Sequence, residues 1–138
     1  MKRVLPLFLL SIVNCSCAGD LKFFESDGCS GFPDGTHEQH TLWLSCCTEH
    51  DRAYWKGGTY EERKKADKAL KVCVEKQGEP EIASLMLAGV RVGGTPYLPT
   101  AFRWGYGWPY SRFYKALTEE ELEEVKAKSV EKPDKPID

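Results

Sequence analysis

The stretch SCCTEHDRAYWKGG, residues 45–58, carries two adjacent cysteines, Cys46 and Cys47, followed closely by His50 and Asp51. On a helix, residues four apart share a face, so Cys46 lies with His50 and Cys47 lies with Asp51. Consecutive residues point about 100° apart, so the histidine and the aspartate must face different neighbours. The partners of the two cysteines therefore decide what each polar side chain meets.

Residues 1–20, MKRVLPLFLLSIVNCSCAGD, have the layout of a cleaved export signal. Basic residues precede an apolar run, and small residues follow up to Ala18, where we expect cleavage. Export to the periplasm or outside the cell follows from this layout. Because Cys15 and Cys17 end the apolar run, a retained form acylated on one of them, a membrane-anchored lipoprotein, stays an alternative. No later run of about 18 apolar residues predicts a membrane span.

The rest of the chain is small and acidic. The whole chain has 138 residues, which leaves room for one domain with a modest core. Without Lys2 and Arg3, 17 of the 19 basic residues remain against 21 acidic residues, a net charge of −4. This balance argues against nucleic acid as a partner. Separately, we expect the chain to be a monomer.

Four cysteines remain after cleavage: Cys29, Cys46, Cys47 and Cys73. In an exported protein two disulfides are the default. A bond between the neighbours Cys46 and Cys47 is sterically poor in a helix, so Cys29 should join one of them and Cys73 the other. A zinc site is the alternative use of such cysteines, together with His37, His40 and His50. The absence of a CxxC spacing argues against it.

Four segments have helical spacing, which predicts a small all-α fold with two antiparallel core helices. They cover about residues 37–55, 59–77, 80–92 and 118–132. Capping-box spacing marks Thr59 with Glu62 and Thr118 with Glu121. The inward positions of the second and third helices should be Ala66, Leu70, Cys73, Val74, Ile82, Leu85, Met86 and Val90.

The outer parts of the domain are polar or irregular. The basic run at residues 63–65 follows two glutamates and is interpreted as a solvated face. Leu117 and Leu122 have the spacing of a hydrophobic staple before the last helix. We expect the domain to span residues 19–128 and a disordered tail to follow at 129–138.

Residues 95–114 are rich in aromatic side chains but hold too many glycines and prolines for a helix or a long strand. We expect an ordered loop that could include a short hairpin. Its aromatic side chains either close the core or form a lipid-facing rim, because tryptophan and tyrosine favour membrane interfaces. Stacking on a sugar or another hydrophobic ligand is a third use. The candidates for a lipid-facing role are Trp55, Trp104 and Trp108.

Two of the possible disulfide bridges would each bring a polar side chain of this helix to a particular neighbour. A Cys29–Cys47 bridge would pin the loop DGCSGFPDG against the Asp51 face. Asp51 would then lie beside Asp27 and several loop carbonyls, which are oxygen ligands suited to calcium.

A Cys46–Cys73 bridge would lay the second helix antiparallel along the His50 face. The rise is ~6 Å from Cys46 to His50 and ~9 Å from Cys73 back to Asp67, so Asp67 would lie roughly level with His50. A histidine oriented by a carboxylate beside a cation suits general-base hydrolysis of an ester.

These residues resemble the secreted phospholipase A2 family. The family's motif of two cysteines, two free positions, His-Asp, two free positions and tyrosine is met by Cys46, Cys47, His50, Asp51 and Tyr54. Its aspartate six residues before a cysteine is matched by Asp67 and Cys73. The DGCS sequence at residues 27–30 is similar to the short bacterial and fungal branch. The resemblance covers about residues 27–78.

The resemblance implies calcium-dependent hydrolysis of the sn-2 ester of phospholipids at a membrane surface or in lipid aggregates. It makes His50 the general base, Asp67 its orienting partner and Tyr54 a hydrogen-bond donor to Asp67. The implied calcium ligands are Asp51, the Asp27 carboxylate and the Gly28 carbonyl. We therefore expect the pairing Cys29–Cys47 and Cys46–Cys73.

Two departures from the family support rival interpretations. GFPDG at residues 31–35 replaces the glycine-rich loop, and residues 19–26 leave no room for an amphipathic N-terminal helix. A non-catalytic exported binding or effector module that keeps the fold is the main rival. Acylation of Cys15 or Cys17 would instead suggest a structural envelope protein. A lone histidine on an apolar stripe is usually structural, but two aspartates around His50 favour catalysis.

Overall fold

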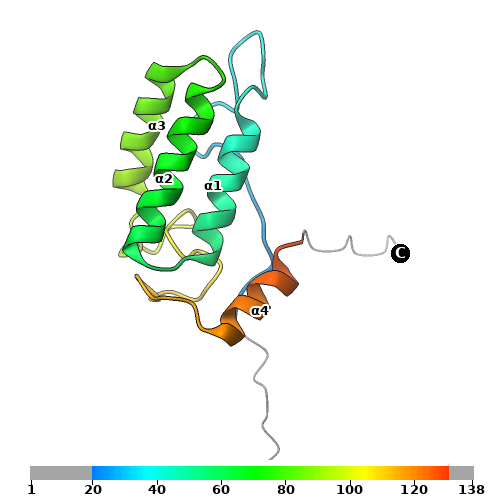
Figure 1. Cartoon of the computed structure of the whole chain (residues 1–138), viewed down its shortest axis with the longest axis vertical. Coiled ribbons are helices and arrows are strands. Elements are labelled where there is room, and N and C mark those ends of the chain that lie inside the picture. Colours follow the sequence, from blue (N-terminus) through cyan, green and yellow to red (C-terminus); the bar gives the residue numbers. More distant parts are fainter. Residues whose placement is uncertain (1–19, 131–138) are drawn as a thin grey trace, which may run out of the picture.

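The chain forms four helices and no strand within the residues that the computed structural model describes, 20–130 (Figure 1). The helices are α1 (Leu44–Lys56), α2 (Tyr60–Glu75), α3 (Pro80–Gly93) and α4 (Glu119–Lys128). The predicted all-α class is therefore confirmed. The expected export signal, with Cys15 and Cys17, and residues 131–138 of the expected tail lie outside the described residues.

Helices α1 and α2 run antiparallel, and α3 packs on α2 (Figure 1). α2 begins with the predicted capping box, in which Thr59 and Glu62 satisfy each other's backbone amides. The main core lies where α1, α2 and α3 meet. Its buried residues are Cys29, Trp43, Cys46, Cys47, Leu70, Val74, Ala83 and Met86.

Some inward positions were predicted wrongly. Leu85 is 57% exposed, whereas Ala83 is fully buried. The buried stripe of α3 follows Ala83, Met86 and Val90, because a three- and four-residue spacing keeps these side chains against α2. The spacing in the sequence fitted two neighbouring stripes, and only the packing partner distinguishes them.

The first helix starts seven residues later than predicted, at Leu44. Residues 37–43 instead form turns whose backbone groups bond to the preceding loop. Trp43 donates its amide to Asp34 O at 3.0 Å and its indole Nε1–H to Pro33 O at 2.7 Å. A Cβ at Gly35 would lie 1.9 Å from Gln39 O, so the two backbone segments touch. This close loop replaces the first two turns of the expected helix.

Both predicted disulfides are present, Cys29–Cys47 and Cys46–Cys73. They close loops of 18 and 27 residues. Each should stabilise the fold by about 3 kcal/mol, because it restricts the conformational freedom of the unfolded chain. Two disulfides in a small domain indicate folding in an oxidising compartment. Within residues 20–130, no helix has the length and apolar character needed to cross a membrane.

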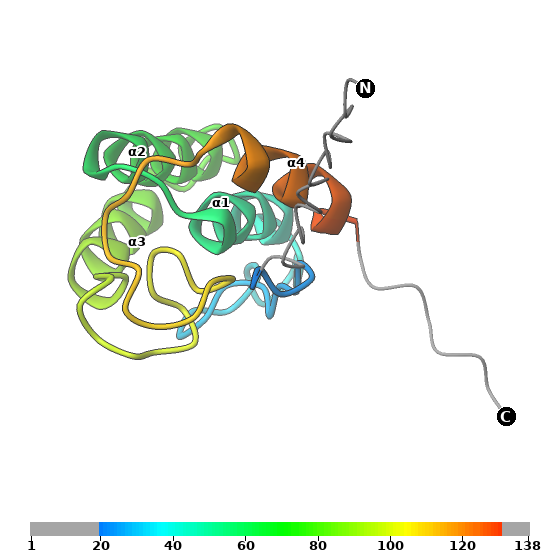
Figure 2. The same ribbon diagram turned by 90° about the horizontal axis from the view of Figure 1, so that it is seen from below.

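The aromatic segment covers the C-terminal end of α1, where helix carbonyls need outside donors. Gly105 N donates to Tyr54 O and Gly107 N to Trp55 O. The indole of Trp108 donates to Lys56 O at 2.8 Å. The segment also runs beside residues 22–25, where Lys22 N donates to Gly107 O, and Figure 2 shows the two stretches on the same side of α1. It is an ordered loop as expected, but it contains no hairpin strands.

The proposed lipid-facing role of three tryptophans is wrong. Trp55, Trp104 and Trp108 are 1%, 1% and 5% exposed. Their indole groups donate to backbone carbonyls of residues 22, 58 and 56. They are therefore structural, which agrees with the expectation that these aromatic side chains close the core.

α4 docks on a second cluster formed by Leu21, Phe24, Trp55 and Trp108. Its capping box at Thr118 and Glu121 is confirmed. The helix ends at Lys128, earlier than expected, where Phe24 N donates to Lys128 O. Of the two staple leucines, Leu117 packs on the second cluster, whereas Leu122 is largely exposed.

Candidate active site

His50 and Asp67 meet between α1 and α2. His50 Nε2 lies 2.9 Å from Asp67 Oδ1, and Asp67 is completely buried. The Cys46–Cys73 disulfide joins the same two helices, one turn away from His50. The expected contact between the two side chains is therefore present.

Tyr54 adds a second donor to the same carboxylate. Its hydroxyl donates to Asp67 Oδ1 at 2.6 Å, and its ring centroid lies 4.2 Å from that of His50. Burial, and after it the Asp67 charge, raises the pKa of Tyr54 far above its usual range. Tyr54 is thus a fixed donor. Its position depends on Gly94, where a Cβ would lie 2.5 Å from Tyr54 Cε1.

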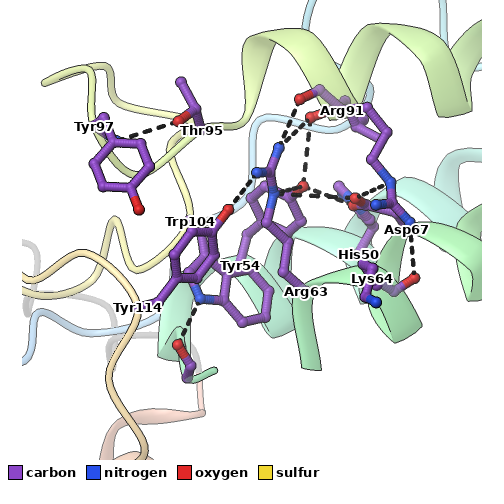
Figure 3. A network of polar contacts seen from close by, with 12 residues as sticks. His50, Tyr54, Arg63, Lys64, Asp67, Arg91, Thr95, Tyr97, Trp104 and Tyr114 are labelled. Carbon is purple, nitrogen blue, oxygen red and sulfur yellow. Dashed lines mark hydrogen bonds and ion pairs between the residues drawn. The ribbon is translucent and has the colours of Figure 1, made fainter. Parts of the chain in front are cut away.

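Arg63 is buried on α2, so the prediction of a solvated basic run is wrong for this residue. Its Nε donates to the Tyr54 hydroxyl at 3.0 Å and its Nη1 to the Tyr114 hydroxyl at 2.6 Å. Its Nη2 donates to the carbonyls of Val90 and Arg91, each at 2.9 Å (Figure 3). Burial lowers the pKa of Arg63, but hydrogen bonds with the two tyrosines outweigh burial and raise it.

Arg91, on α3, reaches the other oxygen of Asp67. Its Nε lies 2.8 Å from Asp67 Oδ2, although neither atom makes a hydrogen bond of good geometry. We interpret the pair as a charge contact, because the distance is short and the N–H direction is poor. The guanidinium groups of Arg63 and Arg91 therefore both lie near this one carboxyl group.

Sequence reasoning missed both arginines, for different reasons. Arg63 precedes Asp67 by four residues and lies on the stripe of Asp67, Leu70 and Val74, so helical spacing contained the signal. Arg91 had no such local signal. Its contact with Asp67 depends on how α3 packs on α2, which no spacing within α3 reveals.

Asp51 lies on the other side of α1, next to the loop held by the Cys29–Cys47 disulfide. Its Oδ2 accepts a hydrogen bond from the Ser26 hydroxyl at 2.7 Å. Burial raises the pKa of Asp51 to about 6, against the lowering effect of Ser26 and with a further contribution from the Asp27 charge. Asp27 and Asp51 are therefore close enough to repel each other when both are charged.

Gly28 and Asp34 shape this loop. Gly28 has φ +76, and a Cβ there would lie 2.6 Å from Asp34 Oδ1, so only glycine fits. Asp34 Oδ1 accepts the Cys29 amide at 3.0 Å. Asp27 accepts the Ser30 hydroxyl at 2.7 Å. Asp34 is thus a turn residue, whereas the charge of Asp27 acts on Asp51.

Side chains alone do not build a metal cage in the part of the chain that the structure describes. No group of three or more His, Cys, Asp or Glu side chains could hold an ion among residues 20–130. All four cysteines of this region are in disulfides, which rules out the zinc alternative that used them. His37 and His40 lie near each other in the turns before α1.

A pocket of about 280 Å³ opens beside His50, Asp51 and Tyr54. Its other walls are mostly apolar or glycine. They include Phe32, Leu70, Met86, Val90 and Phe102. A second, more polar hollow of about 710 Å³ shares Asp51 and Phe102 with the first. The first pocket therefore combines His50, which can transfer a proton, with an apolar lining.

Comparisons with models of protein families, with curated proteins and with solved structures found no match for this chain. The likeness of residues 27–78 to phospholipase A2 therefore stays a prediction from the sequence.

Proposed function

We propose that this chain is an exported hydrolase of the phospholipase A2 type, which uses calcium to cleave the sn-2 ester of phospholipids. The observation that carries the proposal is the position of His50. Its Nε2 contacts the buried Asp67 carboxylate, while the ring borders an apolar pocket that also contains Asp51. The resemblance at residues 27–78 supplies the substrate class.

The dyad suits general-base catalysis. With Nε2–H donated to Asp67, Nδ1 of His50 can take a proton from water as the water oxygen attacks the ester carbonyl carbon. Asp67 stabilises the imidazolium that forms. When the bond between the carbonyl carbon and the alcohol oxygen breaks, the imidazolium returns the proton to that oxygen. The products are a fatty acid and a lysophospholipid.

The oxygens around Asp51 suit calcium as a cofactor. Carboxylates of Asp51 and Asp27 with the Gly28 carbonyl are hard oxygen ligands of the kind that calcium prefers. The pKa of Asp51 is raised mainly by burial and further by the Asp27 charge, and a cation would oppose both effects by stabilising the charged carboxylates. When bound, calcium would polarise the ester carbonyl and stabilise the negative charge that develops on its oxygen.

The apolar pocket suits the start of an acyl chain. Leu70, Met86 and Val90 line it from α2 and α3. Burial of methylene groups there would favour binding by about 0.8 kcal/mol each. This arrangement supports a lipid ester over a small polar ester.

The test is release of fatty acid from mixed phosphatidylcholine and phosphatidylglycerol vesicles by the purified chain. We expect release with calcium and none after chelation. His50→Gln should reduce the rate by about 100- to 10,000-fold, because a positioned general base contributes that much. Lys71→Gln, which removes a charge paired with Glu75 on α2, should keep the wild-type rate.

Two outcomes would overturn the proposal. One is wild-type chain that releases no fatty acid, in which case binding to the vesicles without turnover would favour the non-catalytic module. The other is full activity of His50→Gln.

A further inference from the structure

The two oxygens of the Asp67 carboxylate have different surroundings. Oδ1 contacts His50 Nε2 at 2.9 Å and accepts the Tyr54 hydroxyl at 2.6 Å. Oδ2 makes no hydrogen bond, and its nearest charged partner is Arg91 Nε at 2.8 Å. Arg63 Nε is farther away, at 4.0 Å. Oδ2 therefore depends mainly on Arg91 for a neighbouring positive charge.

This dependence matters because Asp67 is completely buried. A buried carboxylate oxygen without a partner is strongly disfavoured, so loss of Arg91 should make the Asp67 side chain turn or shift toward another donor. Arg63 cannot easily take over, because its Nε already donates to the Tyr54 hydroxyl and its other nitrogens hold Tyr114 and two α3 carbonyls. The position of Arg91 can be followed in Figure 3.

The placement of the Asp67 carboxylate in turn decides which proton form the His50 ring adopts, because Oδ1 contacts Nε2 at 2.9 Å. A charged carboxylate can only accept, so His50 must carry its proton on Nε2 and leave Nδ1 free. If Oδ1 moved away from Nε2, the neutral ring would lose this preference and could carry its proton on Nδ1. In that form Nδ1 cannot remove a proton from water.

We propose that Arg91 is a positioning residue of the site, which holds the Asp67 carboxylate where its Oδ1 accepts from Nε2 of His50, so that the Nε2–H form of the ring prevails. Arg91 touches no reacting atom and acts only through Asp67. Its catalytic consequence rests on the proposed function, whereas its effect on the His50 ring does not. Arg91 lies outside residues 27–78, so the likeness to phospholipase A2 does not include it.

Arg91 can be changed with less damage to the fold than Arg63. Its side chain is 35% exposed, and its other contact is a long hydrogen bond of 3.3 Å to Lys64 O. Arg63 is buried and joins three parts of the chain. Arg91→Ala, Arg91→Lys and the surface control Lys71→Gln therefore form a suitable set, with thermal unfolding confirming that each is folded.

The kinetic test uses the vesicle assay with calcium. Arg91→Ala should lower kcat by about 10- to 100-fold with a change in KM of less than about 3-fold, because misplacing a catalytic group affects the chemical step. Arg91→Lys should keep more of kcat, since it keeps a cation near Oδ2. Added guanidinium ion should restore part of the activity of Arg91→Ala and none in His50→Gln.

A second measurement does not need any activity. Nitrogen-15 correlation spectra of the His50 ring identify which nitrogen of the neutral ring carries the proton. The wild-type chain and Lys71→Gln should show the Nε2–H form, and Arg91→Ala should show a clear fraction of the Nδ1–H form. If folded Arg91→Ala keeps the wild-type ring form, the proposal is overturned, whether or not the chain hydrolyses phospholipid.

Discussion

Asp51 is a half-buried carboxyl group beside a second carboxyl group, and its pKa is raised from 3.8 to about 6. Burial is the main cause. An acid whose pKa is higher in the folded state destabilises the fold once it is charged, so this effect grows as pH rises from about 3.8 to about 6. At neutral pH the charged Asp51 therefore opposes folding in calcium-free protein.

Asp51→Asn should consequently raise the free energy of unfolding in chelator at neutral pH, by about 1 kcal/mol after allowing for solvent screening. The same variant should lose the stabilisation that calcium gives to the wild-type chain. Thermal unfolding with calcium and with chelator measures both effects. Equal stabilisation of wild type and variant by calcium would contradict the assignment of Asp51 as a ligand.

Tyr54 is the hydrogen-bonding link between Asp67 and Arg63. Tyr54→Phe should destabilise the fold by about 1–3 kcal/mol, because the buried Arg63 Nε then has no acceptor at that position. Hydrolysis should fall much less than in His50→Gln, since the His50 contact with Asp67 remains. Urea unfolding together with the vesicle assay separates the two effects. A Tyr54→Phe chain as inactive as His50→Gln would give Tyr54 a direct role.

Helix α4 is held by a bidentate pair between Arg112 and Glu121, with both distances 2.8 Å. The hydrogen bonds from Arg112 lower the pKa of Glu121 from 4.5 to about 2. A carboxyl group with a lowered pKa contributes stability above its ordinary value, and that contribution is lost as pH falls from about 4.5 through about 2.

Glu121→Gln should therefore reduce stability at neutral pH and flatten the loss of stability on acidification. The measurement is the unfolding midpoint across that pH range, with Glu123→Gln as control because Glu123 pairs with exposed Lys126. If both variants follow the wild-type acid profile, the pair does not hold α4 as described.

At the scale of the helices, the sequence predicted those features that depend only on residues close together in the chain. The capping boxes at Thr59 and Thr118 form their hydrogen bonds within four consecutive residues, so they could be identified without knowing the fold. The start of α1 could not, because Trp43 bonds to a loop that precedes it. Leu85 was misplaced for a related reason, since the inward face of α3 is chosen by its contact with α2.

At the scale of the whole molecule, each disulfide holds one half of the candidate site. Cys46–Cys73 joins the helices of His50 and Asp67, and Cys29–Cys47 holds the loop of Asp27 against the Asp51 face. The cysteine spacing left open which of Cys46 and Cys47 joins Cys29, and the resemblance to phospholipase A2 selected the pairing that is present. The arginines around Asp67 were not predicted, because their contacts combine α2 with α3 and the aromatic segment.

Removing the disulfides one at a time should have different effects. Replacing Cys29 and Cys47 by serine should weaken the stabilisation by calcium and leave the His50 ring in its Nε2–H form. Replacing Cys46 and Cys73 should disturb that ring form. Each change should lower stability by roughly 3–4 kcal/mol. Calcium titration and histidine nitrogen-15 spectra check this division, and identical losses in both variants would contradict it.

The central claim is that His50 acts as the base of a calcium-dependent hydrolase specific for the sn-2 ester. The most direct measurement uses phosphatidylcholine vesicles in which the two acyl chains differ in mass, with the released fatty acids identified by mass spectrometry. We predict that wild-type chain with calcium releases the sn-2 acid alone, that His50→Gln slows this release by about 100- to 10,000-fold, and that chelator abolishes it. Equal release of both acids, release in chelator, or no release by folded wild-type chain would contradict the claim.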